Sequence, residues 1–134
     1  MKKTNLKAKA DRIFSKFVRL SHADSQGFCI CYTCGVKKHW KSLHCGHYIG
    51  RRILATRYEI LNCRPQCATC NTFKEGRKDL FALKLEKEFG HGILQELHKI
   101  SMKLYPTLPE QRDLFNHIIE YYKDKVKELE NGKN

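Results

Sequence analysis

Apolar and polar residues alternate at helical spacing over residues 5–21, and this pattern predicts an amphipathic helix. The two sides of that helix differ in kind: one is apolar, and the other carries basic residues that no acidic residue interrupts. The apolar side holds Leu6, Ala10, Ile13, Phe14 and Phe17, and the basic side holds Lys9, Arg12, Lys16 and Arg19. A basic side of this kind fits either a solvated helix surface or a surface that faces phosphate groups.

Three further helices are predicted over residues 79–130, each with an apolar stripe at helical spacing. The first ends at Gly90, and the second, with apolar residues up to Leu104, is ended by Pro106. Thr107 is followed three residues later by a glutamate, as in a capping box, and this predicts the start of the last helix. Such stripes are typical of a protein core, or of a face that joins two copies of a chain.

Residues 24–78 show little helical periodicity and predict a compact region of loops and short strands. A region of this kind buries too little apolar surface to be stable alone, so a bound metal is plausible on energetic grounds. We therefore expect an α+β fold with one domain over residues 1–134. Its parts are the helix over 5–21, the core over 24–78 and the helical part over 79–130.

Seven cysteines lie between residues 29 and 70, and the sequence has none elsewhere. Their odd number, and an N-terminus without the apolar stretch of a signal peptide, argue against a disulfide framework and favour metal binding in a reducing compartment. No apolar run approaches the ~20 residues that span a bilayer. We therefore expect a cytoplasmic protein without a membrane-spanning segment.

Two cysteine pairs have matching spacing. Cys31 and Cys34, like Cys67 and Cys70, are separated by two residues, which lets both thiolates of a pair bind one ion from a single turn. Two such pairs complete a tetrahedral structural zinc site, whose occupation decides whether a small domain folds. A redox-active pair would leave the second pair unexplained, whereas an iron–sulfur cluster stays an alternative. Three cysteines do not belong to either pair. Cys29 and Cys63 are rival ligands, and Cys45 is expected in the core.

The formal net charge is +12, and most of it belongs to the first part of the chain. Residues 1–57 hold 13 Lys and Arg against 2 Asp and Glu, whereas residues 58–134 hold 13 against 12. A concentrated positive field attracts polyanions, because each phosphate contact releases a counterion. We therefore expect a nucleic-acid partner that is bound through its phosphates. The residues expected to contact DNA are Lys9, Arg12, Lys16, Arg19 and Arg57.

Polar residues of another kind lie inside and just after the zinc loop. His47 falls in a strand-like segment, Asn62 in or beside a second one, and Asn71 directly after the last paired cysteine. One residue turns a helix by about 100°, so Asn71 is expected to face away from the zinc and toward the strand that carries His47. A strand with His, a loop with Asn and a helix with a metal ligand follow one another in the ββα-metal fold.

The chain resembles the HNH endonucleases in their His-Asn-Asn form. With Asn directly after the second CxxC pair, it is also similar to the phage recombination endonuclease VII family, and closer still to the phage NinG (Rap) family of recombination nucleases. The resemblance rests on Cys45-Gly46-His47-Tyr48, on Arg57-Tyr58-Glu59 followed by Asn62, on Gln66 through Asn71, and on Gly76 through Gly90. It covers roughly residues 10–90 and does not account for the C-terminal helices.

The resemblance implies a small zinc-stapled ββα-metal core and a metal-dependent endonuclease that acts in phage or bacterial recombination. It also implies branched DNA, such as Holliday junctions, as the substrate. A phage protein of this kind would work in the cytoplasm of a bacterial host. Symmetric cleavage of a four-way junction calls for two active sites, so a homodimer formed through the C-terminal helices is a hypothesis.

Hydrolysis of a phosphodiester needs a base, a divalent cation and positive charge for the developing oxyanion. His47 is the candidate base, because imidazole titrates near neutral pH, and Asn62 is expected to position His47 or its loop. Asn71 offers an oxygen ligand suited to Mg²⁺ or Mn²⁺. Arg51 and Arg52 are candidates for binding the phosphate or stabilising the charge of the leaving group.

One feature of the HNH pattern is missing, because Gly46 stands where many of these enzymes have a metal-binding Asp before the base His. His44, three residues before His47, is a weaker candidate ligand, as are Glu59 and Glu75. The absent carboxylate keeps a second function open, that of a non-catalytic zinc-containing module that binds DNA. A third function, that of a protein-interaction adaptor, would use the C-terminal helices.

Overall fold

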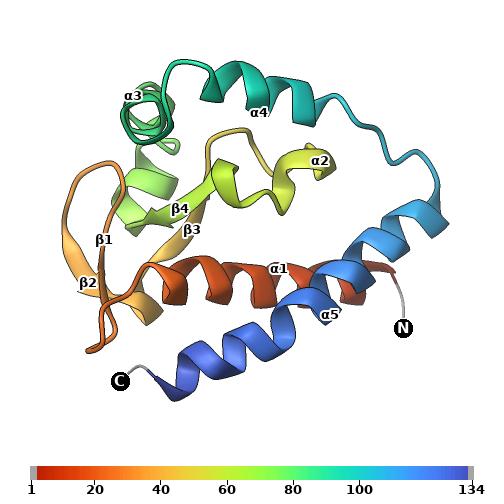
Figure 1. Cartoon of the computed structure of the whole chain (residues 1–134), viewed down its shortest axis with the longest axis horizontal. Helices are drawn as coiled ribbons and strands as arrows, with labels where there is room; N and C mark the ends of the chain where they lie inside the picture. Colours follow the sequence, from red (N-terminus) through yellow and green to blue (C-terminus); the bar gives the residue numbers. More distant parts are fainter. Residues whose placement is uncertain (1–2, 133–134) are drawn as a thin grey trace.

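The computed structural model describes residues 3–132, with side chains from residue 5 onward. Two long helices, α1 and α5, lie side by side and form one side of the molecule (Figure 1). The short strands pack against α1, and two further helices, α3 and α4, cover the opposite side of the strands (Figure 1). The helices are α1 (Lys3–Ser21), α2 (Leu54–Arg57), α3 (Lys78–Phe89), α4 (Ile93–Ser101) and α5 (Leu108–Asn131).

The middle of the chain contains two antiparallel pairs of short strands, β1 with β2 and β3 with β4. The strands are β1 (Phe28–Ile30), β2 (Lys37–His39), β3 (His44–His47) and β4 (Cys63–Gln66). In the second pair, His44 lies opposite Gln66 and His47 lies opposite Cys63. Short turns flank the strands, as 3-10 helices at Trp40–Ser42 and Ile60–Asn62 and as a π-helical turn at Thr69–Phe73. The predicted α+β class is confirmed, although the helix expected to carry Asn71 is this π-helical turn.

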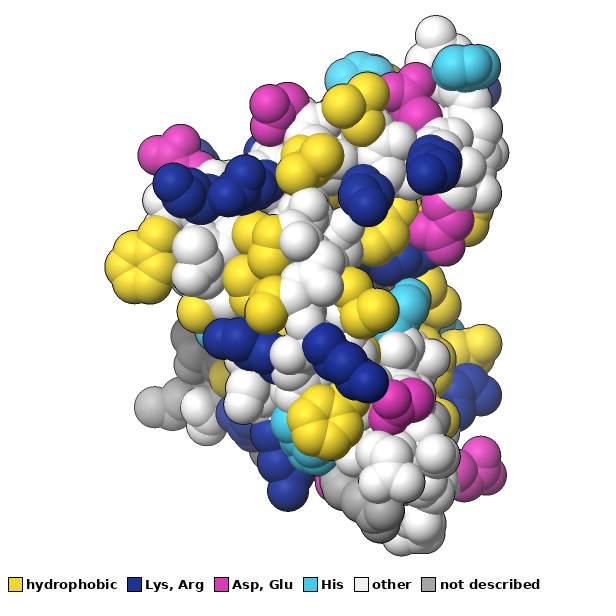
Figure 2. All heavy atoms as spheres, turned by 90° about the vertical axis from the view of Figure 1, so that its left-hand side faces the viewer, with side chains coloured by type: hydrophobic (Ala, Val, Ile, Leu, Met, Phe, Trp, Pro, Cys, Tyr) yellow, Lys and Arg dark blue, Asp and Glu magenta, His cyan; other side chains and the backbone are white. Residues whose placement is uncertain are grey.

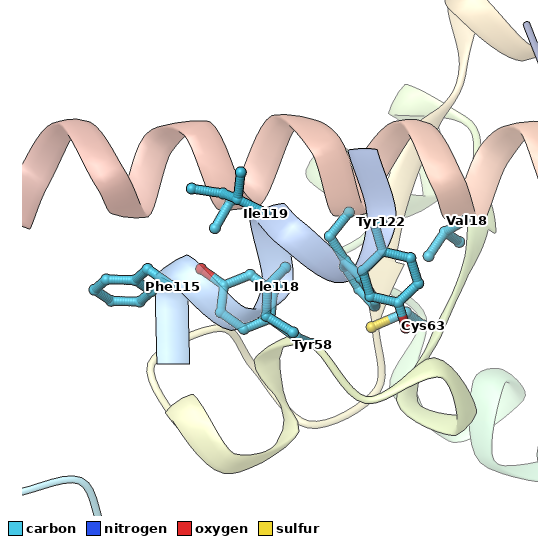
Figure 3. Packing of buried hydrophobic residues seen from close by; sticks show 9 residues of the cluster. Val18, Tyr58, Cys63, Phe115, Ile118, Ile119 and Tyr122 are labelled. Atoms are coloured by element: carbon cyan, nitrogen blue, oxygen red, sulfur yellow. The ribbon is translucent and has the colours of Figure 1, made fainter. Parts of the chain in front are cut away.

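The apolar stripes predicted on the first and last helices pack against each other. Phe14 of α1 contacts Tyr122 of α5 edge-to-face, with 5.4 Å between ring centroids. Tyr58, from the segment between β3 and β4, joins the same cluster and is buried against Phe14 and Phe115 (Figure 3). The stripe of α5 is therefore part of the core, so this stripe is not the free face that the homodimer hypothesis needs.

Helices α3 and α4 form a second, smaller core with Phe81, Leu85, Ile93 and Leu97 at its centre. Gly90 ends α3 with a φ of 94°, in the region where only glycine is unstrained. Helix α4 ends at Ser101, earlier than the apolar pattern predicted. Leu104 is 78% exposed, so a further helical turn would not be stabilised by burial of this side chain. Thr107 begins α5 with the predicted capping box.

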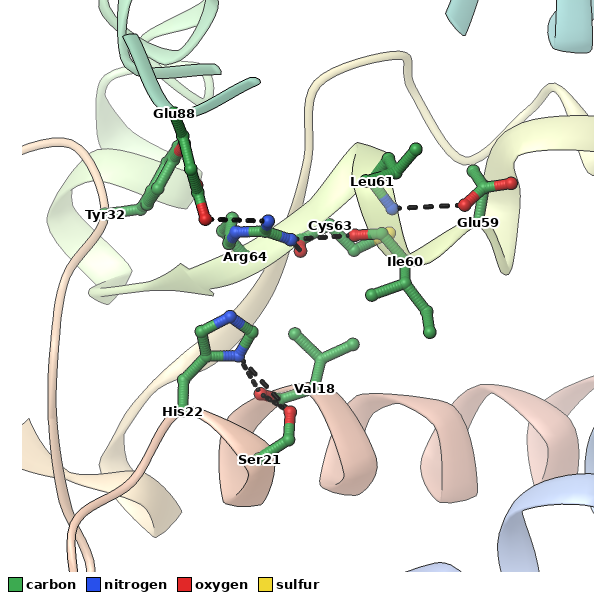
Figure 4. Close-up of polar contacts among 10 residues, drawn as sticks. All are labelled: Val18, Ser21, His22, Tyr32, Glu59, Ile60, Leu61, Cys63, Arg64 and Glu88. Atoms are coloured by element: carbon green, nitrogen blue, oxygen red, sulfur yellow. Dashed lines mark hydrogen bonds and ion pairs between the residues drawn. The ribbon is translucent and has the colours of Figure 1, made fainter. Parts of the chain in front are cut away.

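A buried arginine joins α3 to β4. The Arg64 side chain is 5% exposed, and it donates to the carbonyl oxygens of Ile60 and Cys63, both at 2.8 Å. Its guanidinium also forms an ion pair with Glu88 at 3.3 Å, and the Tyr32 hydroxyl donates to the same carboxylate at 2.7 Å (Figure 4). These contacts fix α3 against the strand that leads to the second cysteine pair.

The surface over β1, β2 and α3 mixes apolar and basic side chains without a single uniform patch (Figure 2). Phe73, in the π-helical turn, is 78% exposed, and Ile30 of β1 is 60% exposed. In the part of the chain that the structure describes, no helix is both long and apolar enough to cross a bilayer.

Candidate functional site

The two CxxC pairs meet at one point. Cys31 and Cys34 lie in the turn between β1 and β2, whereas Cys67 and Cys70 follow β4. Their four sulfur atoms lie within 4.8 Å of one another, and the Sγ atoms of Cys34 and Cys67 are 3.7 Å apart. Sulfur ligands of a tetrahedral zinc ion stand about 3.8 Å apart, given the usual Zn–S distance. This cluster can therefore hold a zinc ion. Cys29 and Cys63, the rival ligands, are not part of it.

Backbone groups around this cluster favour a thiolate. Burial opposes ionisation of Cys31, but backbone N–H groups of Cys34 and Cys67 hydrogen-bond to its sulfur and outweigh burial, lowering the pKa of this thiol to about 6. Gly35 has a φ of 82°, which permits the tight turn after Cys34. The donor set, four sulfurs from two turns, fits zinc.

His47 ends β3 and is 8% exposed. Its Nε2 lies 2.9 Å from the carbonyl oxygen of Arg57. A carbonyl oxygen only accepts hydrogen bonds, so Nε2 carries the proton and Nδ1 keeps the lone pair of the neutral ring. Burial, helped by the charges of Arg51 and Arg57, lowers the pKa of His47 to about 4. The ring is therefore neutral at physiological pH and has one basic nitrogen.

Asn62 is fully buried just before β4 and binds the segment that follows β3. Its Oδ1 accepts from the Ile49 N–H at 2.7 Å, and its Nδ2 donates to the carbonyls of Ile49 and Thr56 at 2.9 and 3.0 Å. Asn62 thus ties together both ends of the loop that carries Arg51. Because Thr56 precedes Arg57, this loop also supplies the carbonyl that holds His47.

The two residues expected to bind the catalytic ion lie together. The Nδ1 of His44, at the start of β3, is 3.1 Å from the side-chain amide of Asn71, which lies in the π-helical turn Thr69–Phe73. Both side chains line one pocket with His47 and Arg51. Arg52 is exposed and does not line this pocket.

Gly46 is glycine because its position packs closely against Gln66 of β4. A Cβ at this position would collide with the side-chain amide of Gln66. The Gln66 amide donates to the Thr33 hydroxyl and to the Gly76 carbonyl, both at 3.0 Å, and so joins the two halves of the zinc region. An Asp at position 46 would require the buried side chain of Gln66 to shift.

The alternative carboxylates lie elsewhere. Glu59 caps the turn before β4, where it accepts from the Leu61 N–H at 3.2 Å, and Glu75 is exposed with a φ of 54°. Neither residue lines the pocket that His47 shares with Asn71. Of the candidates for the missing ligand, only His44 lies at the site.

A family model for the bacteriophage lambda NinG protein matches residues 1–132. The chain belongs to the NinG family. No curated protein and no solved structure matched the chain in the other two comparisons. The NinG match extends beyond the region of the sequence motifs, which ended near residue 90. It includes α4 and α5, so these helices belong to the part of the chain that defines the family.

This NinG chain has a partly buried ion pair that sequence reasoning missed. Asp11 of α1 accepts two hydrogen bonds from the Arg57 guanidinium, at 2.8 and 2.6 Å, and a third from the Tyr58 hydroxyl at 2.8 Å. Arg57 also donates to the Arg51 carbonyl at 2.6 Å, and its side chain is 7% exposed. We predicted that Arg57 contacts DNA, and this was wrong in the structure because its guanidinium is already bound inside the protein. The only signal in the sequence was an isolated acid in a basic helix.

Lys78 is a second residue that the sequence did not indicate. It is the first residue of α3, and its ammonium group donates to the His47 carbonyl oxygen. With His47, Arg51 and Asn71 it lines a smaller pocket beside the first. Lys78 therefore adds a positive charge to the surroundings of the histidine.

The predicted basic side of α1 divides into two halves in this NinG chain. Lys9 and Arg12 are exposed, as a DNA-facing surface requires. Lys16 lies 3.8 Å from Glu130 of α5. Arg19 donates to the Trp40 carbonyl at 3.2 Å and stacks 5.2 Å above the indole ring. Arg19 thus packs against the zinc region, although it also lines the pocket.

Proposed function

We propose that this NinG-family protein is a metal-dependent DNA endonuclease in which His47 activates the attacking water. The observation that carries the proposal is the state of His47. Its ring is buried and neutral, and its Nε2–H donates to the Arg57 carbonyl oxygen. His47 also lines the pocket, and its Nδ1 keeps the lone pair of the ring. A general base needs this combination of fixed orientation and available lone pair.

The metal ligands we propose are His44 and Asn71. The two side chains come from different elements and lie within hydrogen-bonding distance in the pocket, where imidazole nitrogen and amide oxygen are suitable donors for a divalent ion. A bound Mg²⁺ or Mn²⁺ would polarise the scissile phosphate and neutralise its charge. Arg51 and Lys78, beside the same pocket, add positive charge for the oxyanion that develops.

DNA binding follows from the charge distribution. The exposed residues Lys9 and Arg12 of α1, with Arg51 and Arg52 of the loop, offer phosphate contacts. The resemblance to phage recombination nucleases leads us to propose branched DNA, such as a Holliday junction, as the substrate in phage recombination. Exposed basic residues would also bind linear duplex, so the preference for branched DNA needs a direct test.

A second candidate function is DNA binding without cleavage. It is favoured by one observation: the only carboxylate lining the pocket, among the residues that the structure describes, is Asp11. Asp11 is already bound by Arg57 and Tyr58, so metal binding depends on neutral ligands. Neutral ligands hold Mg²⁺ less strongly than carboxylates do.

Cleavage of a labelled four-way junction and of a linear duplex with the same arm sequences tests the two candidates. Each substrate is incubated with the zinc-loaded protein, with and without Mg²⁺ or Mn²⁺. Metal-dependent cleavage with the junction preferred supports the proposed function. Binding of both substrates without cleavage under any metal condition would contradict it and favour the DNA-binding module.

A further inference from the structure

A second cluster of soft ligands lies in the protein, apart from the four paired cysteines. A ring nitrogen of His47 and the sulfur atoms of Cys45 and Cys63 lie within 4.8 Å of one another. Cys45 and His47 are two residues apart on β3 and so share one face, whereas Cys63 lies opposite His47 on β4. The two strands thus bring two thiols and an imidazole to one point.

We propose that Cys45, His47 and Cys63 form a second site for a thiophilic cation such as Zn²⁺, and that its occupation blocks the use of His47 as a base. The consequence for cleavage rests on the function proposed above, whereas the binding site does not. Two thiolates and one imidazole are a common zinc donor set, and three protein ligands leave one position for water or a phosphate oxygen.

The environment of His47 suits a metal ligand as well as a base. Metal-binding histidines usually donate their second N–H to a carboxylate or a backbone carbonyl, which orients the ring. His47 already makes such a bond to Arg57 through Nε2, so Nδ1 is the nitrogen that has a lone pair to give. The Cys63 sulfur lies 3.8 Å from the same carbonyl oxygen. The neutral imidazole has one lone pair, so an ion bound to His47 would take the lone pair that the activation of a water molecule needs.

The cluster is accessible from the candidate active site. Cys45 and His47 line both the main pocket and the smaller one beside it, whereas Cys63 is fully buried beneath them. Zn²⁺ would displace one proton from each thiol, and both protons would pass to solvent. The two thiolates would then neutralise the ion's charge, so the site would gain no net charge near Arg51 and Arg57.

Cadmium binding to the full chain tests the site without relying on cleavage. ¹¹³Cd NMR of the wild-type protein is expected to show two resonances, one from four sulfurs and one from mixed sulfur and nitrogen ligands. Cys45→Ala should lose the mixed resonance and keep the other. Cys29→Ala, which removes a buried cysteine outside both clusters, should keep both. The four-sulfur resonance shows at the same time that each variant is folded around its structural site.

A wild-type spectrum with only the four-sulfur resonance at saturating cadmium would overturn the proposal. A mixed resonance that persists in Cys45→Ala would overturn it too. Cleavage gives the second readout: excess Zn²⁺ should reduce the Mg²⁺-dependent rate several-fold in wild type and in Cys29→Ala, but not in Cys45→Ala. If no variant cleaves DNA, the proposed function fails while the cadmium spectra still decide the binding site.

Discussion

At the scale of single residues, the candidate site depends on the side chains that hold His47 in position. His47 is oriented by a backbone carbonyl, and that carbonyl belongs to Arg57, which Asp11 holds through two hydrogen bonds. Asn62 fixes the loop between them from the other side. A small shift in any of these contacts would move the ring of His47, so they are positioning residues whose loss should be measurable.

Asn62→Ala should destabilise the fold as well as the site. The substitution removes three hydrogen bonds and leaves the N–H and carbonyl of Ile49 without the partner that Asn62 supplies, whereas the Thr56 carbonyl keeps its bond from the Glu59 N–H. Since each such loss costs about 1 kcal/mol or more, we expect the free energy of unfolding to fall by about 3 kcal/mol. Urea unfolding of the zinc-loaded protein measures the change. Asn116→Ala, on the exposed side of α5, is the matched control and should change little. Equal stability of the two variants would refute the role given to Asn62.

Asp11→Asn should show a pH-dependent loss of stability. Burial alone would raise the pKa of Asp11, but hydrogen bonds and charge from Arg57 and a hydrogen bond from Tyr58 lower it below 3.8. A carboxylate whose pKa is lower in the folded than in the unfolded protein stabilises the fold at pH values above its unfolded pKa. This stabilisation is lost as the pH falls through the folded pKa. The gap in melting temperature between wild type and Asp11→Asn should therefore be present at pH 7 and shrink below about pH 4. The exposed Asp113→Asn is the control, and a gap that does not depend on pH would contradict the assigned cause.

At the scale of secondary-structure elements, a zinc ion at the cysteine cluster would add to a small apolar core. Strands β1 to β4 are three or four residues long, too short to be stable by themselves. The four cysteines join the turn after β1 to the turn after β4, and Trp40 packs in the same cluster. The π-helical turn that carries Asn71 begins inside the second cysteine pair, so a zinc ion bound there would also position the proposed metal ligand.

Removal of zinc should unfold this region, and the single tryptophan reports on it. Trp40 is 6% exposed beside the cysteine cluster, so its fluorescence should shift to longer wavelength when a chelator removes the metal. The far-UV circular dichroism and melting temperature should fall together with this shift. Unchanged tryptophan emission and melting after verified removal of zinc would show that the metal does not hold the fold.

At the scale of the whole molecule, the packed pair of α1 and α5 supports the candidate site, because α1 contacts both β3 and β4. The sequence predicted both helices because apolar spacing and the capping box at Thr107 are local signals. The cluster of the four paired cysteines was equally predictable, since their spacing is what a tetrahedral metal site requires.

The contacts between distant segments could not be predicted in the same way. The pair of Asp11 with Arg57 joins residues 46 positions apart, and no local pattern marks which cation an isolated acid will bind. Arg57 therefore looked like a DNA contact. The early end of α4 had a similar cause, because Leu104 continues the apolar pattern but finds no surface to cover it.

The most direct test of the central claim separates binding from cleavage at His47. His47→Ala and the control His91→Ala, whose side chain is exposed in the loop after α3, are compared with wild type on a four-way junction with Mg²⁺. Gel-shift assays without metal measure binding, and single-turnover cleavage measures the chemical step. We expect His47→Ala to bind the junction as wild type does and to cleave at least 100-fold more slowly, within the usual range for loss of a general base, while His91→Ala cleaves normally. Cleavage by His47→Ala at the wild-type rate would show that His47 is not the base.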